Sequence, residues 1–248
     1  MKVLLLDLET APNLGHVWGL WQQNVGLPQL IASGYTLCWA AKWYGDKELM
    51  FNSIHKTNAE SMVSEIYELV NSADAVVHYN GTKFDMPTLN KEFLLHGLTP
   101  PAPYKNIDLL GVARRQFRFP SNKLDYIAQA LKLGKKTKHV GHELWIGCMN
   151  GDEESWKQME EYNRNDVILL EKLYDKFKPW IRSTANQGLF REDNLCCPAC
   201  GSTRYQRRGY ANTASRRYQR YHCTECGNWF RSSKCEPGST TKYVNVAS

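Results

Sequence analysis

The chain has 248 residues, of which 42% are hydrophobic and 23% are charged, an ordinary soluble composition with enough apolar side chains for a packed core. No apolar stretch approaches the roughly 20 residues that a membrane-spanning helix needs, and the apolar start is too short and too acidic for a signal peptide. These features argue against any membrane association and predict a cytoplasmic protein, whose eight cysteines lie in a reducing compartment.

The positive charge is concentrated at one end of the chain. The formal net charge is +6, from 31 basic and 25 acidic residues. Residues 196–248 hold nine of the basic residues and two of the acidic ones, which leaves 22 against 23 in the rest of the chain. A near-neutral body with a basic C-terminal segment indicates a polyanionic partner.

The first predicted element is a buried strand. Residues 2–9 form an apolar run rich in Val and Leu that ends in acids, which is typical of a central strand with polar groups at its tip. Residues 11–33 carry glycines and prolines between aromatic residues, and we expect an irregular loop or insertion there. Because this loop leaves from beside the acids, Trp18 and Trp21 could cover a substrate groove.

Strands and helices then alternate. We expect a hairpin with strands at 35–44 and 48–54, a helix at about 58–72, a strand at about 74–79, and helices at about 86–96, 122–132 and 153–177. This order predicts an α/β fold in which a mixed sheet has helices on both faces.

Composition divides the chain into two parts. Pro179, Gly188 and the polar residues around them indicate a linker, after which cysteine, arginine and tyrosine become frequent. We expect a first domain at residues 1–180, a linker at 181–194, a cysteine-rich module at 195–235 and a flexible tail at 236–248.

Two segments place carboxylates at the ends of strands. Asp7 and Glu9 are two residues apart on a strand, so both project to the same side at its C-terminal end. Asp85 follows a short strand and a polar turn, at the start of a helix with Pro87 in its first turn. The alternative interpretations are a pair of solvated loop acids and a helix-capping aspartate.

The third segment is the most informative. Tyr162 and Asp166 lie one turn apart in an apolar stripe with helical spacing, on the face that should be buried. A buried carboxylate is costly unless it is paired or bound to metal, and we favour metal over a structural partner. Together with Asp7, Glu9 and Asp85, it could hold two divalent cations about 3.5–4 Å apart, and oxygen ligands favour Mg²⁺ or Mn²⁺.

The three segments resemble the three motifs of DEDD-superfamily 3′→5′ exonucleases, especially the proofreading domains of family B DNA polymerases. They read Asp-Leu-Glu-Thr at 7–10, Tyr-Asn-x-x-x-Phe-Asp-x-Pro at 79–87 and Tyr-x-x-x-Asp at 162–166, in the family's order and about its separations. The similarity spans roughly residues 1–178. It implies a ribonuclease H-like fold and hydrolysis of single-stranded or frayed 3′ ends, with DNA favoured over RNA.

The resemblance assigns roles to individual residues. It implies that Asp7, Glu9 and Asp166 ligate the first metal, that Asp7 bridges to the second, and that Asp85 holds the second through water. Tyr162 would orient the attacking water.

The resemblance also indicates a subclass and a setting. The histidine subclass carries its base five positions before the last aspartate, where this chain has Glu161, so the chain falls in the tyrosine subclass. Thr10, Asn80 and Phe84 match positions that hold the terminal nucleotides. A free-standing nuclease of this kind suits phage or mobile-element DNA replication, in the host cytoplasm and beside replication proteins.

One basic segment is set aside. Residues 133–137, Leu-Gly-Lys-Lys-Thr, resemble the end of a phosphate-binding loop. Gln129 stands where that motif requires glycine, so we reject an ATPase.

The C-terminal module carries two metal-binding knuckles of the form Cys-x-x-Cys-Gly. They are separated by 22 residues and contain Cys197 with Cys200 and Cys223 with Cys226. Four thiolates leave no open coordination position, so we expect one structural Zn²⁺ in a zinc ribbon and not a redox pair. The module resembles the zinc ribbons of some transposases and transcription factors.

Arginine is interleaved with tyrosine between the knuckles, on what should be a hairpin. Guanidinium groups contact phosphates and aromatic rings stack on bases, so this pattern indicates nucleic-acid binding. The candidate contacts are Arg207, Arg208, Arg216, Arg217 and Arg220.

Three alternatives stand beside a DNA exonuclease. They are a nucleic-acid-binding regulator with a non-catalytic nuclease fold, a proofreading subunit of a separate polymerase, and an RNA exonuclease. The presence of all four acids and Tyr162 argues against the regulator, and no polymerase motif follows the nuclease segment.

Overall fold

The computed structural model describes residues 1–137, 140–181, 186–191 and 195–244. The chain forms two compact units, residues 2–174 in one and residues 175–248 together with Met1 in the other. Parts of the predicted linker and of the predicted tail lie outside the described residues. No helix among the described residues is both long and apolar enough to cross a membrane.

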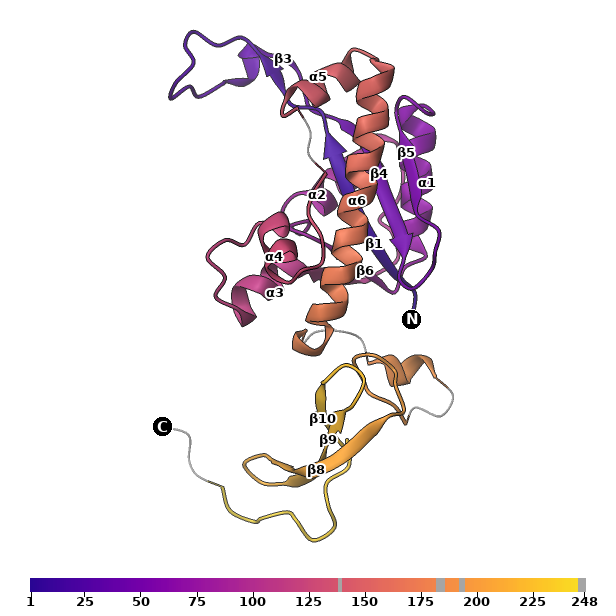
Figure 1. The fold of residues 1–248 in the computed structure, drawn as a ribbon, viewed down its shortest axis with the longest axis vertical. Helices are drawn as coiled ribbons and strands as arrows, with labels where there is room; N and C mark the ends of the chain where they lie inside the picture. The colour runs from indigo at the N-terminus through magenta and orange to yellow at the C-terminus, as the bar shows by residue number, and fades with distance from the viewer. Residues whose placement is uncertain (138–139, 182–185, 192–194, 245–248) are drawn as a thin grey trace. The chain divides into compact units, whose positions relative to one another are not determined.

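A five-stranded mixed sheet forms the centre of the first unit (Figure 1), with the strand order β5-β4-β1-β6-β7. β1 pairs antiparallel with β4 and parallel with β6, which places it in the middle of the sheet. The strands are β1 (Val3–Thr10), β4 (Thr36–Trp43), β5 (Met50–Ser53), β6 (Ala75–His78) and β7 (Lys105–Asp108). The predicted central strand and the predicted hairpin, β4 with β5, are confirmed.

Six helices of the described residues accompany the sheet. They are α1 (Ala59–Asn71), α2 (Asp85–Leu95), α3 (Leu109–Gln116), α4 (Leu124–Ala130), α5 (Glu143–Met149) and α6 (Glu153–Phe177). The four predicted helices are confirmed, and their ends fall within two residues of the prediction. Two further helices, α3 and α5, are short, and neither was predicted from the apolar pattern. A local signal for α3 exists, because the Asp108 carboxylate accepts hydrogen bonds from Leu110 N and Gly111 N.

The two faces of β1 have different partners. Leu4, Leu6 and Leu8 join side chains of α1 and α2 in one hydrophobic core. Successive strand residues point to opposite faces, so Asp7 and Glu9 face the other side, where α6 lies across the sheet (Figure 1). A slip of one residue in the register of β1 would bury both acids among leucines, so the core fixes the position of the acids. The predicted mixed sheet with helices on both faces is confirmed.

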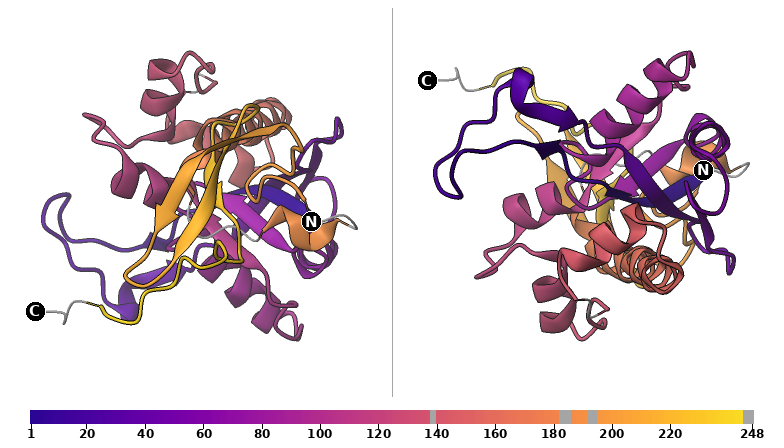
Figure 2. Two further views of the ribbon diagram at one scale, coloured as in Figure 1. Left: turned by 90° about the horizontal axis from the view of Figure 1, so that it is seen from below. Right: turned by 90° about the horizontal axis from the view of Figure 1, so that it is seen from above.

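The segment between β1 and β4 is more ordered than predicted. It contains the paired strands β2 (Leu14–Gly15) and β3 (Leu30–Ala32), and a 3₁₀ turn at Leu27–Gln29 lies between them, directly before β3. We expected an irregular loop or insertion at 11–33; the segment is an insertion, but it is not irregular throughout, because cross-strand hydrogen bonds such as that from His16 N to Gln29 O hold it. The segment stands clear of the sheet and helices of its unit (Figure 2).

The second unit is built around a three-stranded antiparallel sheet with the order β10-β9-β8. Its elements are η2 (Lys178–Trp180), η3 (Gln187–Phe190), β8 (Tyr205–Asn212), β9 (Arg217–Cys223) and β10 (Trp229–Arg231). The predicted hairpin between the knuckles is β8 with β9. Beyond residue 235 the chain hydrogen-bonds back to this hairpin, with Glu236 N donating to Arg217 O and Thr241 N to Ser215 O.

Candidate active site

Three of the predicted carboxylates meet at the C-terminal end of β1. One carboxylate oxygen from each of Asp7, Glu9 and Asp166 lies within 4.8 Å of the other two. Asp7 and Glu9 come from the α6-facing side of β1, and Asp166 comes from the face of α6 that packs on it. Asp166 is 1% exposed, so its charge is held away from solvent.

Asp85 reaches the same strand from α2. Its Oδ1 accepts a hydrogen bond of 3.2 Å from Leu8 N, between the two acids of β1. The turn before α2 permits this approach because Gly81 has no side chain. A Cβ at Gly81 would lie 2.7 Å from Asp85 Oδ2 and 2.4 Å from the His78 ring.

Crowding of the acids makes their charges costly. Burial and the charges of Asp166, Glu9 and Asp85 raise the pKa of Asp7 well above its usual range. Burial raises the pKa of Glu9 to about 8 and that of Asp85 to about 7, and it also raises the pKa of Asp166. Such a cluster needs cations to ionise fully near neutral pH.

Lys136 supplies one cation that the sequence did not reveal. Its ammonium lies 2.5 Å from Asp166 Oδ2 and 2.9 Å from the Tyr162 hydroxyl. Burial alone would lower the pKa of Lys136, but its contacts with Asp166 and Tyr162 outweigh burial and raise the pKa, so the ammonium stays charged. Lys136 therefore connects the predicted catalytic tyrosine to the aspartate one helical turn away.

Two further residues fix the orientation of the acids. The Asn163 amide, which is fully buried, donates hydrogen bonds of 2.7 Å to Asp7 Oδ2 and 3.4 Å to Asp7 O. The indole of Trp145, on α5, donates a hydrogen bond of 3.2 Å to Glu9 Oε2. Asn163 lies three residues before Asp166 on α6, so helical spacing alone could have identified it. Trp145 carried no such signal.

A cavity of about 590 Å³ opens beside the acids, and its lining combines three basic residues with two aspartates, three polar residues and two leucines. Asp7 lies on its wall with Asn80, Arg114, Lys123 and Lys136. Cations and amides in this arrangement suit phosphates and base edges. The predicted contact Asn80 lines the cavity, in a turn with φ +69° that Asp108 Oδ1 holds by accepting from Asn80 N.

The other two predicted nucleotide contacts lie near the acids but do not line this cavity. Thr10 is the last residue of β1 and is half-buried. Phe84, immediately before Asp85, has 48% of its surface exposed.

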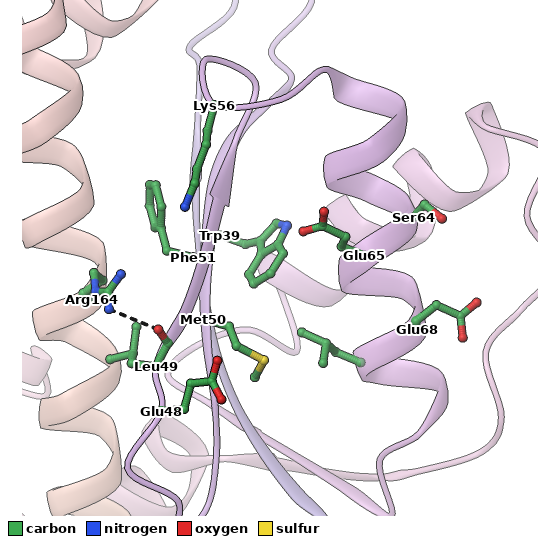
Figure 3. Close-up of a pocket in the computed structure, with 11 residues that line it drawn as sticks. Trp39, Glu48, Leu49, Met50, Phe51, Lys56, Ser64, Glu65, Glu68 and Arg164 are labelled. Atoms are coloured by element: carbon green, nitrogen blue, oxygen red, sulfur yellow. Dashed lines mark hydrogen bonds between the residues drawn. The ribbon is translucent and has the colours of Figure 1, made fainter.

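A second cavity, of about 550 Å³, lies beside the edge strand β5 (Figure 3). Trp39, Glu65 and Arg164 are among its lining residues, and Arg164 Nη2 donates to Leu49 O across its rim. None of the four acids lines it, so it is separate from the candidate active site.

The acidic cluster fits divalent metal. Asp166 Oδ1 is buried and has no hydrogen-bond partner among the described residues, which leaves a carboxylate oxygen available as a ligand. Three carboxylates within 4.8 Å provide the hard oxygen donors that Mg²⁺ and Mn²⁺ prefer. The geometry therefore agrees with a divalent-cation site held by β1 and α6.

The four knuckle cysteines also meet. Their sulfur atoms all lie within 4.8 Å of one another. Cys197 Sγ is 3.8 Å from Cys226 Sγ, and Cys200 Sγ is 3.7 Å from Cys223 Sγ. A tetrahedral site with Zn–S distances of about 2.3 Å places its sulfur atoms about 3.8 Å apart. The cluster therefore has the dimensions of a structural zinc site.

All five predicted arginine contacts are exposed; four lie on β8 and β9, and Arg216 lies immediately before β9. Several guanidinium groups of this unit stack on aromatic rings. Arg217 lies over Tyr210 at 4.6 Å and Arg220 over Trp229 at 5.1 Å, measured to the ring centroids. Stacking restricts these side chains, and Arg220 Nε also donates a hydrogen bond of 2.9 Å to Arg208 O.

These features define a class of protein: a mixed α/β fold that gathers carboxylates from several elements at the end of its central strand, where they can bind divalent cations. Residues 34–178 match the RNase H superfamily, and the chain belongs to it. The matched region contains Asp85, Tyr162 and Asp166. It begins after Asp7 and Glu9 and ends before the cysteine knuckles.

The solved structures include a similar fold. The family B DNA polymerase from the hyperthermophilic archaeon Pyrobaculum calidifontis superposes with a TM-score of 0.53 at 18% sequence identity. The similarity covers 72% of this chain and 24% of the polymerase chain, so this chain spans about a quarter of that protein. No curated protein matches the sequence.

The raised carboxyl pKa values predict how stability depends on pH. With the pKa of Glu9 at about 8 and that of Asp85 at about 7, the folded protein binds more protons than the unfolded chain, whose carboxyls titrate near their ordinary values of about 4. In magnesium-free buffer, the unfolding temperature should therefore fall as pH rises from about 5 to 8.

Magnesium should oppose this loss. Because it binds the ionised acids, it should raise the unfolding temperature more at pH 8 than at pH 6, which differential scanning fluorimetry can measure. An Asp7→Asn variant should lose most of this magnesium effect. Equal magnesium stabilisation at the two pH values would contradict the assignment of these carboxyls.

Proposed function

We propose that this protein is a metal-dependent 3′→5′ exonuclease that hydrolyses single-stranded or frayed ends of DNA, with the zinc ribbon gripping the nucleic acid. One observation carries the proposal: Asp7, Glu9 and Asp166 converge within 4.8 Å beside a cavity that three basic residues help to line, with Asp85 bonded to the same strand. We infer a role in replication of a phage or mobile element.

Each residue of the site has a separate role in this proposal. Two divalent cations, when bound, would supply the chemistry, by making hydroxide available near neutral pH and neutralising charge on the attacking and leaving oxygens. Asp7, Glu9 and Asp166 would hold one cation, and Asp85 would hold the other through water. Tyr162 would orient the attacking water with its hydroxyl, and Lys136, 2.9 Å away, positions that hydroxyl.

The lining of the cavity supports an acidic polymer as substrate. Arg114, Lys123 and Lys136 outnumber the two aspartates of the lining, Asp7 and Asp125, and this excess of positive charge favours phosphates. Asn80 adds amide groups for a base or a sugar. The similar fold of a DNA polymerase supports DNA, although RNA cleavage is an outcome that the first experiment distinguishes.

The deciding experiment is digestion of strands labelled at the 5′ end. Single- and double-stranded DNA and RNA are incubated with the protein, with and without Mg²⁺, and the products are separated by length. We expect a ladder that shortens one nucleotide at a time from the 3′ end of single-stranded DNA, only with metal. Immediate release of a labelled mononucleotide would indicate the opposite polarity, and undigested strands at all Mg²⁺ and Mn²⁺ concentrations would reject the proposal.

The arginines of the ribbon should control the salt dependence of binding. Each phosphate contact to a single strand contributes about −0.7 to the slope of log K against log salt. Arg216→Gln with Arg217→Gln should therefore make the slope shallower by about 1.4 and weaken binding at low salt. Anisotropy of a labelled oligonucleotide over a salt series measures this. Lys157→Gln, which changes an exposed cation of α6, is the matched control, and an equal change there would argue against a specific ribbon contact.

A further inference from the structure

The insertion between β1 and β4 carries the most exposed large apolar side chains among the described residues of its unit. Trp18 is 97% exposed, Leu20 88%, Trp21 84% and Leu27 85%. Contiguous exposed apolar groups on a soluble protein mark an interaction surface. Of residues 14–32, Leu14–Gly15 and Leu30–Ala32 pair as short strands, and Trp18, Leu20 and Trp21 lie in the loop that these strands close.

The insertion is also uncharged. Residues 11–34 contain no Asp, Glu, Lys or Arg, whereas 23% of the whole chain is charged. Its surface therefore neither attracts phosphates nor repels them. Its tryptophans instead offer flat apolar faces, which suit the faces of nucleobases.

The two ends of the insertion, which we call its root, adjoin the elements that carry the candidate active site. The insertion begins directly after Thr10, at the end of the strand that carries Asp7 and Glu9. The Gly34 N–H donates to Asn13 Oδ1 at 2.6 Å, and Lys91 on α2 donates to Gly34 O at 3.1 Å. The root is therefore tied to the two elements that hold three of the four acids, while the tip projects outward (Figure 2).

We propose that Trp18 and Trp21 stack on bases of the single-stranded substrate, several nucleotides from the end that is cut. This inference rests on the proposed function. The cavity of about 590 Å³ beside the acids has the size of a small-molecule site, so a longer strand must extend beyond it. The cavity contacts the phosphates near the cut end, and the insertion contacts bases farther along the strand without sequence preference.

The test compares oligonucleotides of two lengths. Zinc-loaded full-length protein in magnesium-free buffer binds 5′-labelled single strands of about 4 and about 16 nucleotides, which span the site sizes of single-strand binding modules. Phosphorothioate linkages at the 3′ end suppress cleavage. We expect Trp18→Ala with Trp21→Ala to weaken binding of the longer strand by about tenfold for each tryptophan, with a far smaller loss for the shorter strand.

Two matched variants separate stacking from general effects. Trp18→Phe with Trp21→Phe keeps aromatic faces and should restore most of the affinity for the longer strand. Leu94→Ala with Leu95→Ala removes exposed apolar groups from α2, 77% and 72% exposed, and should leave affinity unchanged. Unfolding temperatures of all variants should match that of the unaltered protein, because the replaced side chains are exposed.

Three results would overturn the inference. The first is equal affinity of the double alanine variant and the unaltered protein for the longer strand. The second is equal loss for both lengths. The third is conversion of a dimer to a monomer with oligonucleotide affinity unchanged, which would make a second copy the occupant. Absence of cleavage with Mg²⁺ would reject the proposed function but would not alter this binding measurement, so the two failures are distinguishable.

Discussion

Replacing Asp7 by asparagine should reduce hydrolysis of single-stranded DNA by more than about a thousandfold while oligonucleotide binding persists. Asp7 is central to the cluster, because the charges of Asp166, Glu9 and Asp85 all act on its carboxylate. The substitution preserves the shape of the side chain and removes the charge that a bridging metal ligand needs. Initial rates at saturating substrate, together with anisotropy in magnesium-free buffer, measure the two effects separately.

Asp46→Asn is the matched control for this change. Asp46 lies in the exposed turn after β4, so its substitution alters net charge equally without touching the cluster. It should leave the rate of hydrolysis within about twofold of the unaltered protein, as surface substitutions usually do. Full activity of Asp7→Asn would show that catalysis does not depend on the carboxylate cluster.

Replacing Cys223 by serine should unfold the C-terminal module. Cys223 and Cys197 are fully buried and form, with Ala199, the small core of this unit. A module of this size has little other apolar material, and structural zinc typically contributes roughly 10–16 kcal/mol of apparent folding free energy at neutral pH. Metal analysis should give about one zinc per chain for the unaltered protein and far less for the variant, and hydrogen exchange should show loss of protection in β8 and β9.

Cys235→Ser tests whether the loss of zinc and of folding is specific to the four clustered cysteines. Cys235 is half-buried and is not one of the four clustered cysteines, so this variant should retain its zinc. The carboxylate cluster lies in the other unit, so Cys223→Ser should weaken binding of long strands more than it slows the chemical step. Unchanged zinc content and unchanged protection in Cys223→Ser would refute the zinc ribbon.

The parts of this fold that the sequence predicted are those with strong local periodicity. The apolar run of β1 and the stripe of α6 each define a buried face, so the placement of Asp7, Glu9 and Asp166 followed from strand alternation and helical spacing. The cysteine knuckles could also be predicted, because the Cys-x-x-Cys spacing by itself brings two thiolates to one metal ion. Short elements such as α5, which has seven residues and is apolar at most of them, have no polar face to mark a period.

The residues that the sequence did not reveal depend on tertiary contacts. Lys136 belongs to a segment whose composition is that of a basic loop, and only the path of the chain past α6 brings its ammonium to Asp166. The indole of Trp145 reaches Glu9 for the same reason. The paired strands of the insertion are short, and the glycines and prolines around them indicated a loop, so the strands were not predicted.

The measurement that tests the central claim most directly is anomalous diffraction at the manganese edge, from crystals of the protein grown with Mn²⁺ and a cleavage-resistant oligonucleotide. The predicted map has manganese peaks between Asp7, Glu9 and Asp166 and near Asp85, about 3.5–4 Å apart. A map with manganese elsewhere, and with the Lys136 ammonium still the sole cation beside Asp166, would contradict the assignment of this cluster as a two-metal nuclease site.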